Sequence, residues 1–208
     1  MSEQRVLWYF ADPMCSWCWG FAPVIDAINE TYRERIALAL VMGGLRAGTT
    51  EPVTPAFRAD IQHHWEEVQR RTGQPFRFDG ALPDGFVYDT EPACRAVVVM
   101  EELMPEAKFS YFKSVQAVFY AEGRDVTQPA TLASLAAAQG LEERRFLEHF
   151  EADYIKRKTF QHFEQTQQAG IRGFPTAVLQ DERGFALLTY GYAPLADLQP
   201  KIDDWLRQ

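Results

Sequence analysis

The stretch Asp12–Gly20, which reads Asp-Pro-Met-Cys-Ser-Trp-Cys-Trp-Gly, decides the fold of this chain. It comes soon after Arg5–Phe10, a run rich in aromatic and β-branched residues and too short for a buried helix, so we predict a buried strand there. From Cys15 to about Arg35, apolar side chains recur at the spacing of one helical face. A second apolar run, Ile36–Met42, comes next. Strand, helix and strand in this order predict a βαβ unit with parallel strands.

The pattern changes to helices between Glu51 and about Gly170. Thr54 has the residue type of an N-cap and Pro55 suits the first helical position, so we predict that a helix begins there. Four more helices are predicted from apolar side chains at helical spacing, and the last is a long helix that begins near Phe146. The apolar positions of the first four are Phe57, Ile61, Trp65 and Val68, then Cys94, Val97 and Val98, then Phe109, Phe112 and Phe119, then Leu132, Leu135 and Ala136.

The chain returns to strands near its C-terminal end. Thr176–Leu179 and Phe185–Tyr190 flank a turn at Asp181–Gly184, which predicts a β-hairpin. A closing helix is predicted from Leu195, Leu198, Ile202 and Trp205. We therefore predict an α/β fold whose core consists of residues 1–50 and 171–208. An all-helical insertion subdomain, residues 51–170, interrupts this core.

Composition and charge narrow the class of protein. The 208 residues are 47% hydrophobic and 24% charged, which is typical of a globular chain and excludes a disordered one. The 21 Lys and Arg against 29 Asp and Glu give a net charge of −8, which argues against nucleic acid or an anionic membrane surface as a partner. Proteins or small molecules are the expected partners.

The location of the protein is predicted from its apolar segments. No stretch approaches the 18 apolar residues of a membrane span, and the N-terminal stretch lacks the features of a signal peptide. We therefore expect a soluble cytoplasmic protein. Thiols are kept reduced in that compartment, so a close cysteine pair there indicates catalysis or metal binding before a structural disulfide.

Cys15 and Cys18 form a Cys-x-x-Cys motif where a strand ends and a helix begins. Residues three apart lie on one side of a helix, within reach of a disulfide. A helix N-terminus stabilises a thiolate, and Cys15 is expected at the exposed edge while Cys18 is shielded one turn further in. Cys15 is then the attacking thiolate, and Cys18 resolves the mixed disulfide.

Zinc binding is the main alternative for this motif, because zinc sites use the same spacing. Such a site needs two more ligands, and the remaining candidates do not form a second paired motif. Adjacent His63 and His64 point in different directions on a helix and are interpreted as surface and groove residues. Cys94 shares a helical face with valines, so we interpret it as a buried hydrophobe. No metal and no permanently bound cofactor are predicted.

A second motif, Ile171-Arg-Gly-Phe-Pro-Thr176, precedes the predicted hairpin. Together with Cys15-x-x-Cys18 after a first strand and a helical insertion, it resembles the DsbA-like branch of the thioredoxin superfamily. The sequence of residues 12–20 is similar to the corresponding motif of FrnE-type members of that branch. The resemblance covers the chain end to end and implies a thioredoxin fold with a large helical insertion.

The resemblance also implies which residues form the site. The Phe174-Pro175 bond is expected to be cis and to lie across from Cys15 and Cys18. A proline there has no N–H to compete at the thiols and leaves neighbouring backbone free to pair with substrate. Catalytic roles are assigned to Cys15, Cys18 and Pro175. The predicted substrate contacts are Trp17, Phe174 and Thr176, although Trp17 and Trp19 could equally pack between the two parts of the chain.

Two positions, Ser16 and Tyr9, depart from the family pattern. Ser16 stands where FrnE-type proteins commonly have proline, which leaves the oxidising strength open. Tyr9 stands six residues before the first cysteine, where thioredoxins carry a buried acid. Asp12 is the nearest upstream acid, and we interpret it as an exposed turn-former, with proton transfer as the alternative. Arg46 follows the second predicted strand and is either a loop residue or a ligand for a carboxylate such as one of glutathione.

The sequence therefore predicts a thiol-disulfide oxidoreductase. It would act as a reductase or isomerase on protein or low-molecular-weight disulfides, with glutathione among the candidate partners. Glutathione-dependent isomerases and transferases of the kappa-class architecture are an alternative, although they use serine where this chain has Cys15. A zinc-binding or chaperone-like interaction module is the alternative from a different class.

Overall fold

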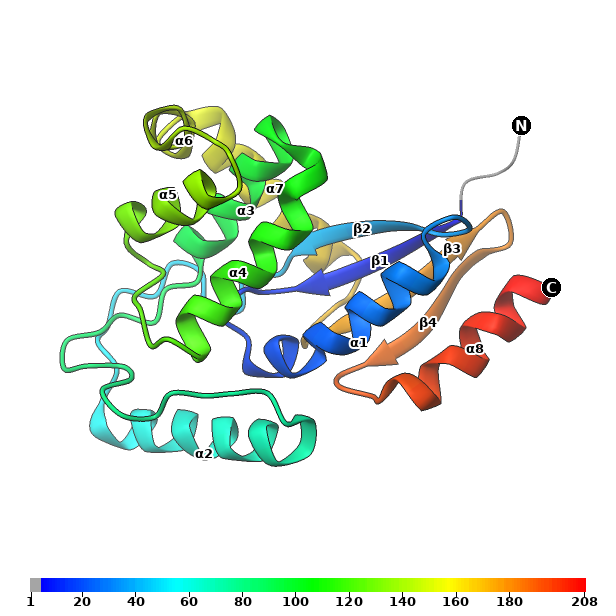
Figure 1. Cartoon of the computed structure of the whole chain (residues 1–208), viewed down its shortest axis with the longest axis horizontal. Helices are drawn as coiled ribbons and strands as arrows, with labels where there is room; N and C mark the ends of the chain where they lie inside the picture. The colour runs from blue at the N-terminus through cyan, green and yellow to red at the C-terminus, as the bar shows by residue number, and fades with distance from the viewer. Residues whose placement is uncertain (1–4) are drawn as a thin grey trace.

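A four-stranded sheet in the order β2-β1-β3-β4 is the centre of the fold. The computed structural model describes residues 5–208, and Figure 1 shows their arrangement. The elements, in chain order, are β1 (Val6–Ala11), α1 (Ser16–Tyr32), β2 (Ala37–Met42), α2 (Pro55–Thr72), α3 (Glu91–Leu103), the short 3₁₀ helix η1 (Pro105–Ala107), α4 (Lys108–Tyr120), α5 (Pro129–Ala138), α6 (Glu143–Phe150), α7 (Asp153–Gln168), β3 (Thr176–Asp181), β4 (Gly184–Tyr190) and α8 (Leu195–Arg207).

The sheet has the predicted βαβ and ββα topology. β1 and β2 are parallel, with Val6 opposite Ala37, whereas β3 pairs antiparallel with both β1 and β4. Alternate side chains of β1 point to opposite faces. On one face the ring of Tyr9 packs against Phe21 of α1, and α8 lies beside α1 along the sheet. This arrangement places the C-terminal end of β1 directly before α1, where the Cys-x-x-Cys motif lies.

Helices α2 to α7 lie between β2 and β3 in the chain, and α7 is fastened to the edge strand β2. The backbone N–H of Met42 donates to Nδ1 of His162 at 3.3 Å. The hydroxyl of Thr166, one turn further along α7, donates to the carbonyl of Met42 at 3.2 Å. Two side chains thus satisfy backbone groups that an edge strand leaves unpaired. They hold the helical segment to the end of β2, beside the candidate site.

The predicted start of α2 is confirmed. The backbone N–H of Phe57 donates to Oγ1 of Thr54 at 3.2 Å, and Pro55 occupies the first turn. Thr90 precedes α3 in the same way but makes no capping hydrogen bond. Its hydroxyl instead accepts the N–H of Arg46 at 3.1 Å, so it holds the loop after β2 rather than its own helix.

The long fifth helix predicted from Phe146 onward is wrong. Helix α6 ends at Phe150, and the backbone of Ala152 is extended at φ −68° and ψ 133° before α7 begins. The guanidinium of Arg95 on α3 lies 3.9 Å from the centre of the Phe150 ring and donates to the carbonyl of Phe150 at 3.0 Å. This contact satisfies a carbonyl that a continuous helix would use, so the interruption depends on a residue 55 positions away.

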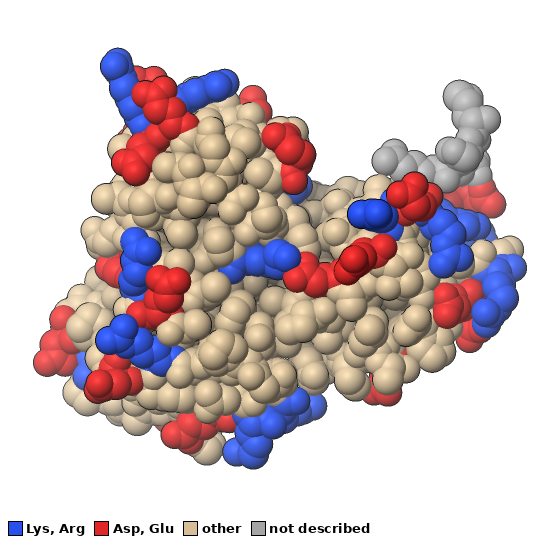
Figure 2. Space-filling view, in the orientation of Figure 1, with Lys and Arg blue, Asp and Glu red and all other residues tan. Residues whose placement is uncertain are grey.

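Charged side chains of both signs lie on the surface of the molecule (Figure 2). None of the helices that the structure describes is long and apolar enough to cross a membrane. On the face in Figure 2, Lys and Arg side chains lie beside Asp and Glu side chains, mostly around the rim.

Candidate active site

Cys15 is the residue at which α1 begins. It follows β1 and a tight turn in which its N–H donates to the carbonyl of Asp12 at 3.1 Å, and its backbone is extended at φ −93° and ψ 116°. Its thiol donates to the carbonyl of Phe174 at 3.6 Å. Only 5% of the residue is exposed, so the expectation of an exposed edge position is wrong. The Phe174 loop covers the sulfur that the first helical turn presents.

Cys18 lies one turn further into α1 and is fully buried. Burial raises the pKa of its thiol, and the neighbouring Cys15 raises that pKa further. Cys15, Cys18 and Cys94 are all free thiols. The two cysteines of the motif thus differ in the predicted direction, with Cys15 next to the surface and Cys18 behind it.

The Phe174-Pro175 peptide bond is cis, as the family resemblance implied. The loop that carries it lies against Cys15 through the Phe174 carbonyl. The N–H of Gly191 donates to the Pro175 carbonyl at 2.7 Å. Thr176 is fully buried, and its hydroxyl donates to the carbonyl of Gly173 at 2.8 Å. Pro175 and Thr176 therefore shape the loop, while Phe174 faces the thiol.

A cavity of about 440 Å³ opens in front of Cys15. Apolar walls come from α1, α2 and the two loops after β2 and before β3, and two cationic or titratable side chains, Arg46 and His64, reach the same space. The apolar lining consists of Met14, Trp17, Leu45, Phe57, Ile61, Trp65 and Phe174. Residues from α1, from α2 and from the loops at the ends of the strands thus share one pocket around the thiol of Cys15.

Of the two roles predicted for Trp17 and Trp19, lining the substrate groove and packing between the two parts of the chain, each residue has one. Trp17 is half-buried, lines the cavity and lies 6.1 Å from the ring of Tyr192. Trp19 is buried, donates its indole N–H to the Pro75 carbonyl at 3.0 Å and stacks on Tyr120. Trp17 is therefore available to a substrate, whereas Trp19 packs between α1 and the helical segment.

Arg46 brings a positive charge to the cavity. Its guanidinium lies 4.5 Å from the centre of the Phe57 ring, and this cation–π contact holds it toward the pocket. Within residues 5–208 no carboxylate lies at ion-pair distance from it, and its Nε is buried without a hydrogen-bond partner. Arg46 thus has unused hydrogen-bonding capacity in the pocket of Cys15.

Asp12 is fully buried, so its interpretation as an exposed turn-former is wrong. One carboxylate oxygen accepts the N–H of Met14 at 2.8 Å, and the other accepts the N–H of Leu45 at 2.7 Å. The thiol of Cys94 also donates to the second oxygen, at 3.5 Å. Burial raises the pKa of the Asp12 carboxyl, while these hydrogen bonds act in the opposite direction. Asp12 joins the turn before Cys15 to the loop that carries Arg46.

Replacement of Asp12 by alanine is expected to lower the free energy of unfolding by about 2–5 kcal/mol, since it leaves two buried N–H groups unpaired. Urea unfolding followed by fluorescence measures this loss. Asp84→Ala is a matched control, because the Asp84 side chain is 97% exposed and forms a surface ion pair with Arg58. A surface pair contributes little, so the control should be close to the unchanged protein. Equal effects of the two substitutions would contradict the role given to Asp12.

The remaining sequence candidates are Cys94, His63 and His64. Cys94 is fully buried, as predicted, although its contact with Asp12 was not foreseen. His63 is exposed on α2, while His64 reaches the rim of the cavity. In the part of the chain that the structure describes, no three His, Cys, Asp or Glu side chains are grouped to hold a metal ion.

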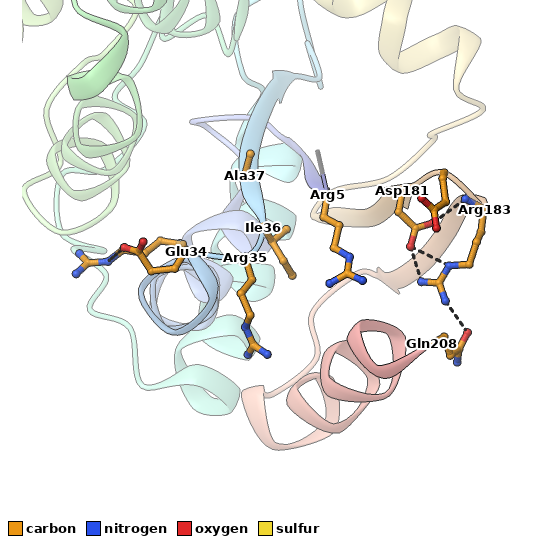
Figure 3. A pocket seen from close by; sticks show the side chains of 10 residues that line it. Arg5, Glu34, Arg35, Ile36, Ala37, Asp181, Arg183 and Gln208 are labelled. Atoms are coloured by element: carbon orange, nitrogen blue, oxygen red, sulfur yellow. Dashed lines mark hydrogen bonds and ion pairs between the residues drawn. The ribbon is translucent and has the colours of Figure 1, made fainter. Parts of the chain in front are cut away.

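A second cavity, of about 750 Å³, lies at the opposite end of the sheet (Figure 3). Arg5 precedes β1, Arg35 precedes β2, and Asp181 and Arg183 come from the β3–β4 turn. Arg183 is paired with Asp181 there. No cysteine lines this cavity, and its walls are the starts of β1 and β2, whereas Cys15 follows the end of β1. It is therefore separate from the thiol site.

Comparisons with known proteins agree with this geometry. The model of the DSBA-like thioredoxin domain family matches residues 6–203. The crystal structure of a candidate protein disulfide isomerase from Nitrosomonas europaea is 46% identical, with a TM-score of 0.93 and 99% of each chain covered. The cytosolic disulfide reductase DsbM from Pseudomonas aeruginosa, solved with GSH, is 29% identical, with a TM-score of 0.80 over 98% of this chain and 100% of that chain.

A curated relative is more distant. The ClpXP adapter protein SpxH of Halalkalibacterium halodurans is 21% identical over 178 residues, which is 83% of this chain, and this chain spans 57% of the length of that relative. These matches do not distinguish the FrnE-type branch, which stays a prediction. The family match over residues 6–203 and the cysteine pair at the start of α1 lead to one conclusion: the chain belongs to the DSBA-like thioredoxin domain family of thiol-disulfide oxidoreductases.

Proposed function

We propose that this chain is a dithiol reductase in which Cys15 attacks a disulfide and Cys18 resolves the product. The observation that carries the proposal is the placement of Cys15 on the wall of a cavity at the N-terminus of α1, with Cys18 buried one turn behind it. The Cys15 thiolate forms a mixed disulfide and releases one thiolate of the substrate. Cys18 then attacks the Cys15 sulfur, which releases the second half as a thiol and leaves a Cys15–Cys18 disulfide. An external thiol reductant returns the pair to its starting state.

The direction of the reaction and its compartment rest on DsbM. That protein is a cytosolic disulfide reductase and aligns with nearly the whole chain at 29% identity. Together with the expectation from the sequence, it supports reduction of disulfides in the cytoplasm. Cytosolic reductants keep such a dithiol supplied with electrons.

Glutathione-type disulfides are the substrate class that the cavity favours. Its volume of about 440 Å³ is within the range of small-molecule sites. Glutathione carries carboxylates, and Arg46 supplies an unpaired cation beside Cys15. DsbM was solved with GSH, which supports the same ligand class here. Trp17 and Phe174 line the cavity and would contact the substrate. Thr176 would hold the loop through its hydrogen bond to the Gly173 carbonyl.

Steady-state reduction of glutathione disulfide tests this proposal. The Arg46→Gln variant tests the part of Arg46 in binding the substrate. The KM for glutathione disulfide should rise about tenfold or more, because a hydrogen bond between charged groups is lost, while kcat changes less. The KM for hydroxyethyl disulfide, which has no carboxylate, should stay the same.

Arg144→Gln is the matched control, because Arg144 lies on α6 with 83% of its side chain exposed. Its kinetics should equal those of the unchanged protein for both substrates. An equal rise of KM for the charged and the uncharged disulfide in Arg46→Gln would show that Arg46 shapes the pocket and does not bind a carboxylate.

Isomerase activity on proteins is a second candidate. It is favoured by the 46% identity to a candidate protein disulfide isomerase, and by the exposed Leu45 beside half-buried Trp17 and Phe174 at the cavity, which offer apolar contact to an unfolded segment. Recovery of activity from a scrambled disulfide protein, in the absence of added oxidant, distinguishes isomerisation from net reduction.

A further inference from the structure

Tyr9 is a fully buried tyrosine beneath the first turns of α1. Its ring lies 5.9 Å from that of Phe21 on α1 and meets the ring of Phe112 on α4 edge to face at 6.2 Å. Cys18 precedes Phe21 by three residues, so both side chains lie on the face of α1 that packs onto β1. Tyr9 therefore packs against the same face of α1 as Cys18.

The hydroxyl of Tyr9 has no hydrogen-bond partner among the described residues. No atom of residues 5–208, sulfur included, forms a hydrogen bond with it while the cysteines are free thiols. A buried hydroxyl without a partner costs free energy, and such groups in folded proteins call for an explanation. Burial raises the pKa of Tyr9 most, and the charges of Cys18, Cys15 and Asp26 raise it further. The phenol thus keeps its proton and has an O–H that can donate to a thiolate.

Cys18 needs a donor at the step in which it reacts. Its thiol must become a thiolate to attack the mixed disulfide, yet burial and Cys15 raise the pKa of Cys18. The backbone of Asp12 lowers this pKa through a hydrogen bond, whereas the negative charge of its carboxylate raises it. A neutral O–H stabilises the developing negative charge on the sulfur without adding a charge of its own.

We infer that the Tyr9 hydroxyl donates a hydrogen bond to the Cys18 sulfur and stabilises it as Cys18 attacks Cys15 in the mixed disulfide. The inference rests on the proposed two-cysteine reaction and adds a residue to its second step. In that step the Cys18–Cys15 bond forms and the bond from Cys15 to the substrate sulfur breaks. The proton of Cys18 leaves with the substrate as its thiol, and the Tyr9 proton remains on the phenol.

Reaction of Tyr9→Phe with the thionitrobenzoate disulfide separates the two steps. In a Cys94→Ala background, Cys15 releases one thionitrobenzoate in a first phase, and Cys18 releases the other in a second phase. Phenylalanine keeps the ring contacts with Phe21 and Phe112 and removes only the hydroxyl. The first phase should keep its rate, whereas the second should slow about tenfold, as expected for a lost hydrogen bond to a charged group. The free energy of unfolding should stay the same or rise, because an unpaired hydroxyl is removed.

Tyr111→Phe is the matched control. Tyr111 is also fully buried, but its hydroxyl donates to the carbonyl of Leu132 at 2.9 Å, so the substitution should lower stability and leave both phases unchanged. An unchanged second phase in Tyr9→Phe overturns the inference, as does equal slowing of both phases. Absence of a first phase in the Cys94→Ala background itself would instead mean that Cys15 does not attack disulfides, and the proposed function would fail.

Discussion

Replacement of Cys15 by serine is expected to lower the turnover of disulfide reduction by about 10³-fold or more, because a serine hydroxyl is a far weaker nucleophile than a thiolate. Cys94 cannot take over, since it is fully buried and donates to Asp12. The reduction assay with glutathione disulfide measures the loss. Cys94→Ala is the control and should keep most of the activity.

Cys18→Ser should fail at a different point. Cys15 still forms the mixed disulfide, but no second thiol resolves it, so the protein should accumulate one bound glutathione. Mass spectrometry of the intact protein detects this adduct, and its removal by a reductant shows that it is a disulfide. An adduct on Cys18 in the Cys15→Ser variant would reverse the assigned order of attack.

Gly43→Ala should have the second large effect, although residue 43 has no reactive group. Gly43 ends the strand pairing of β2, with its N–H donating to Ala11 at 2.8 Å, and its backbone touches the Phe174 ring. A Cβ there would lie 2.1 Å from Cζ of Phe174. The ring must then move, and we expect the loop that carries it to shift from Cys15 with it. Turnover should fall on the order of 10²-fold, as is found when reacting groups are misplaced by about 1 Å. Unfolding free energy should fall by about 1–3 kcal/mol, as for overpacking.

Gly48→Ala is the matched control for this substitution. Gly48 lies in the same loop region with φ at +79°, and nothing lies within 4 Å of an added Cβ. It should lose about 1–2 kcal/mol through its left-handed backbone and keep its turnover. Wild-type turnover in Gly43→Ala would show that the Phe174 loop does not depend on this contact.

The elements that the sequence predicted well are those set by local patterns. The first strand, predicted at Arg5–Phe10 and found at Val6–Ala11, and the hairpin were recognised from apolar runs and turn residues. The N-cap at Thr54 was recognised from its own side chain and the following proline. The position of Cys15 at the start of α1 follows from the same reasoning, because a strand and a helical repeat meet there. The division into residues 1–50 with 171–208 and residues 51–170 stays a prediction.

The features that the sequence did not predict depend on distant partners. The break between α6 and α7 is stabilised by Arg95 from α3. Asp12 was interpreted as a surface turn residue because two of its hydrogen-bond donors, Leu45 and Cys94, are 33 and 82 positions away. The one available signal for Asp12 was its place between a buried strand and the cysteine pair, and that place did not indicate burial by itself.

The sequence by itself determined the order of the strands and helices, the spacing of Cys15 and Cys18 and the start of α1 between β1 and the first helical turn. These depend on side-chain periodicity and on residues three or four positions apart. Only the tertiary structure decided how deeply Cys15 is covered and which tryptophan faces the cavity. It also decided that Arg46 lines that cavity and that Nε of Arg46 and the Tyr9 hydroxyl are buried without hydrogen-bond partners. Exposure and unpaired hydrogen-bonding groups are set by contacts between β1, the loop after β2, α2 and the Phe174 loop, because a side chain loses water only when segments far apart in the chain pack over it.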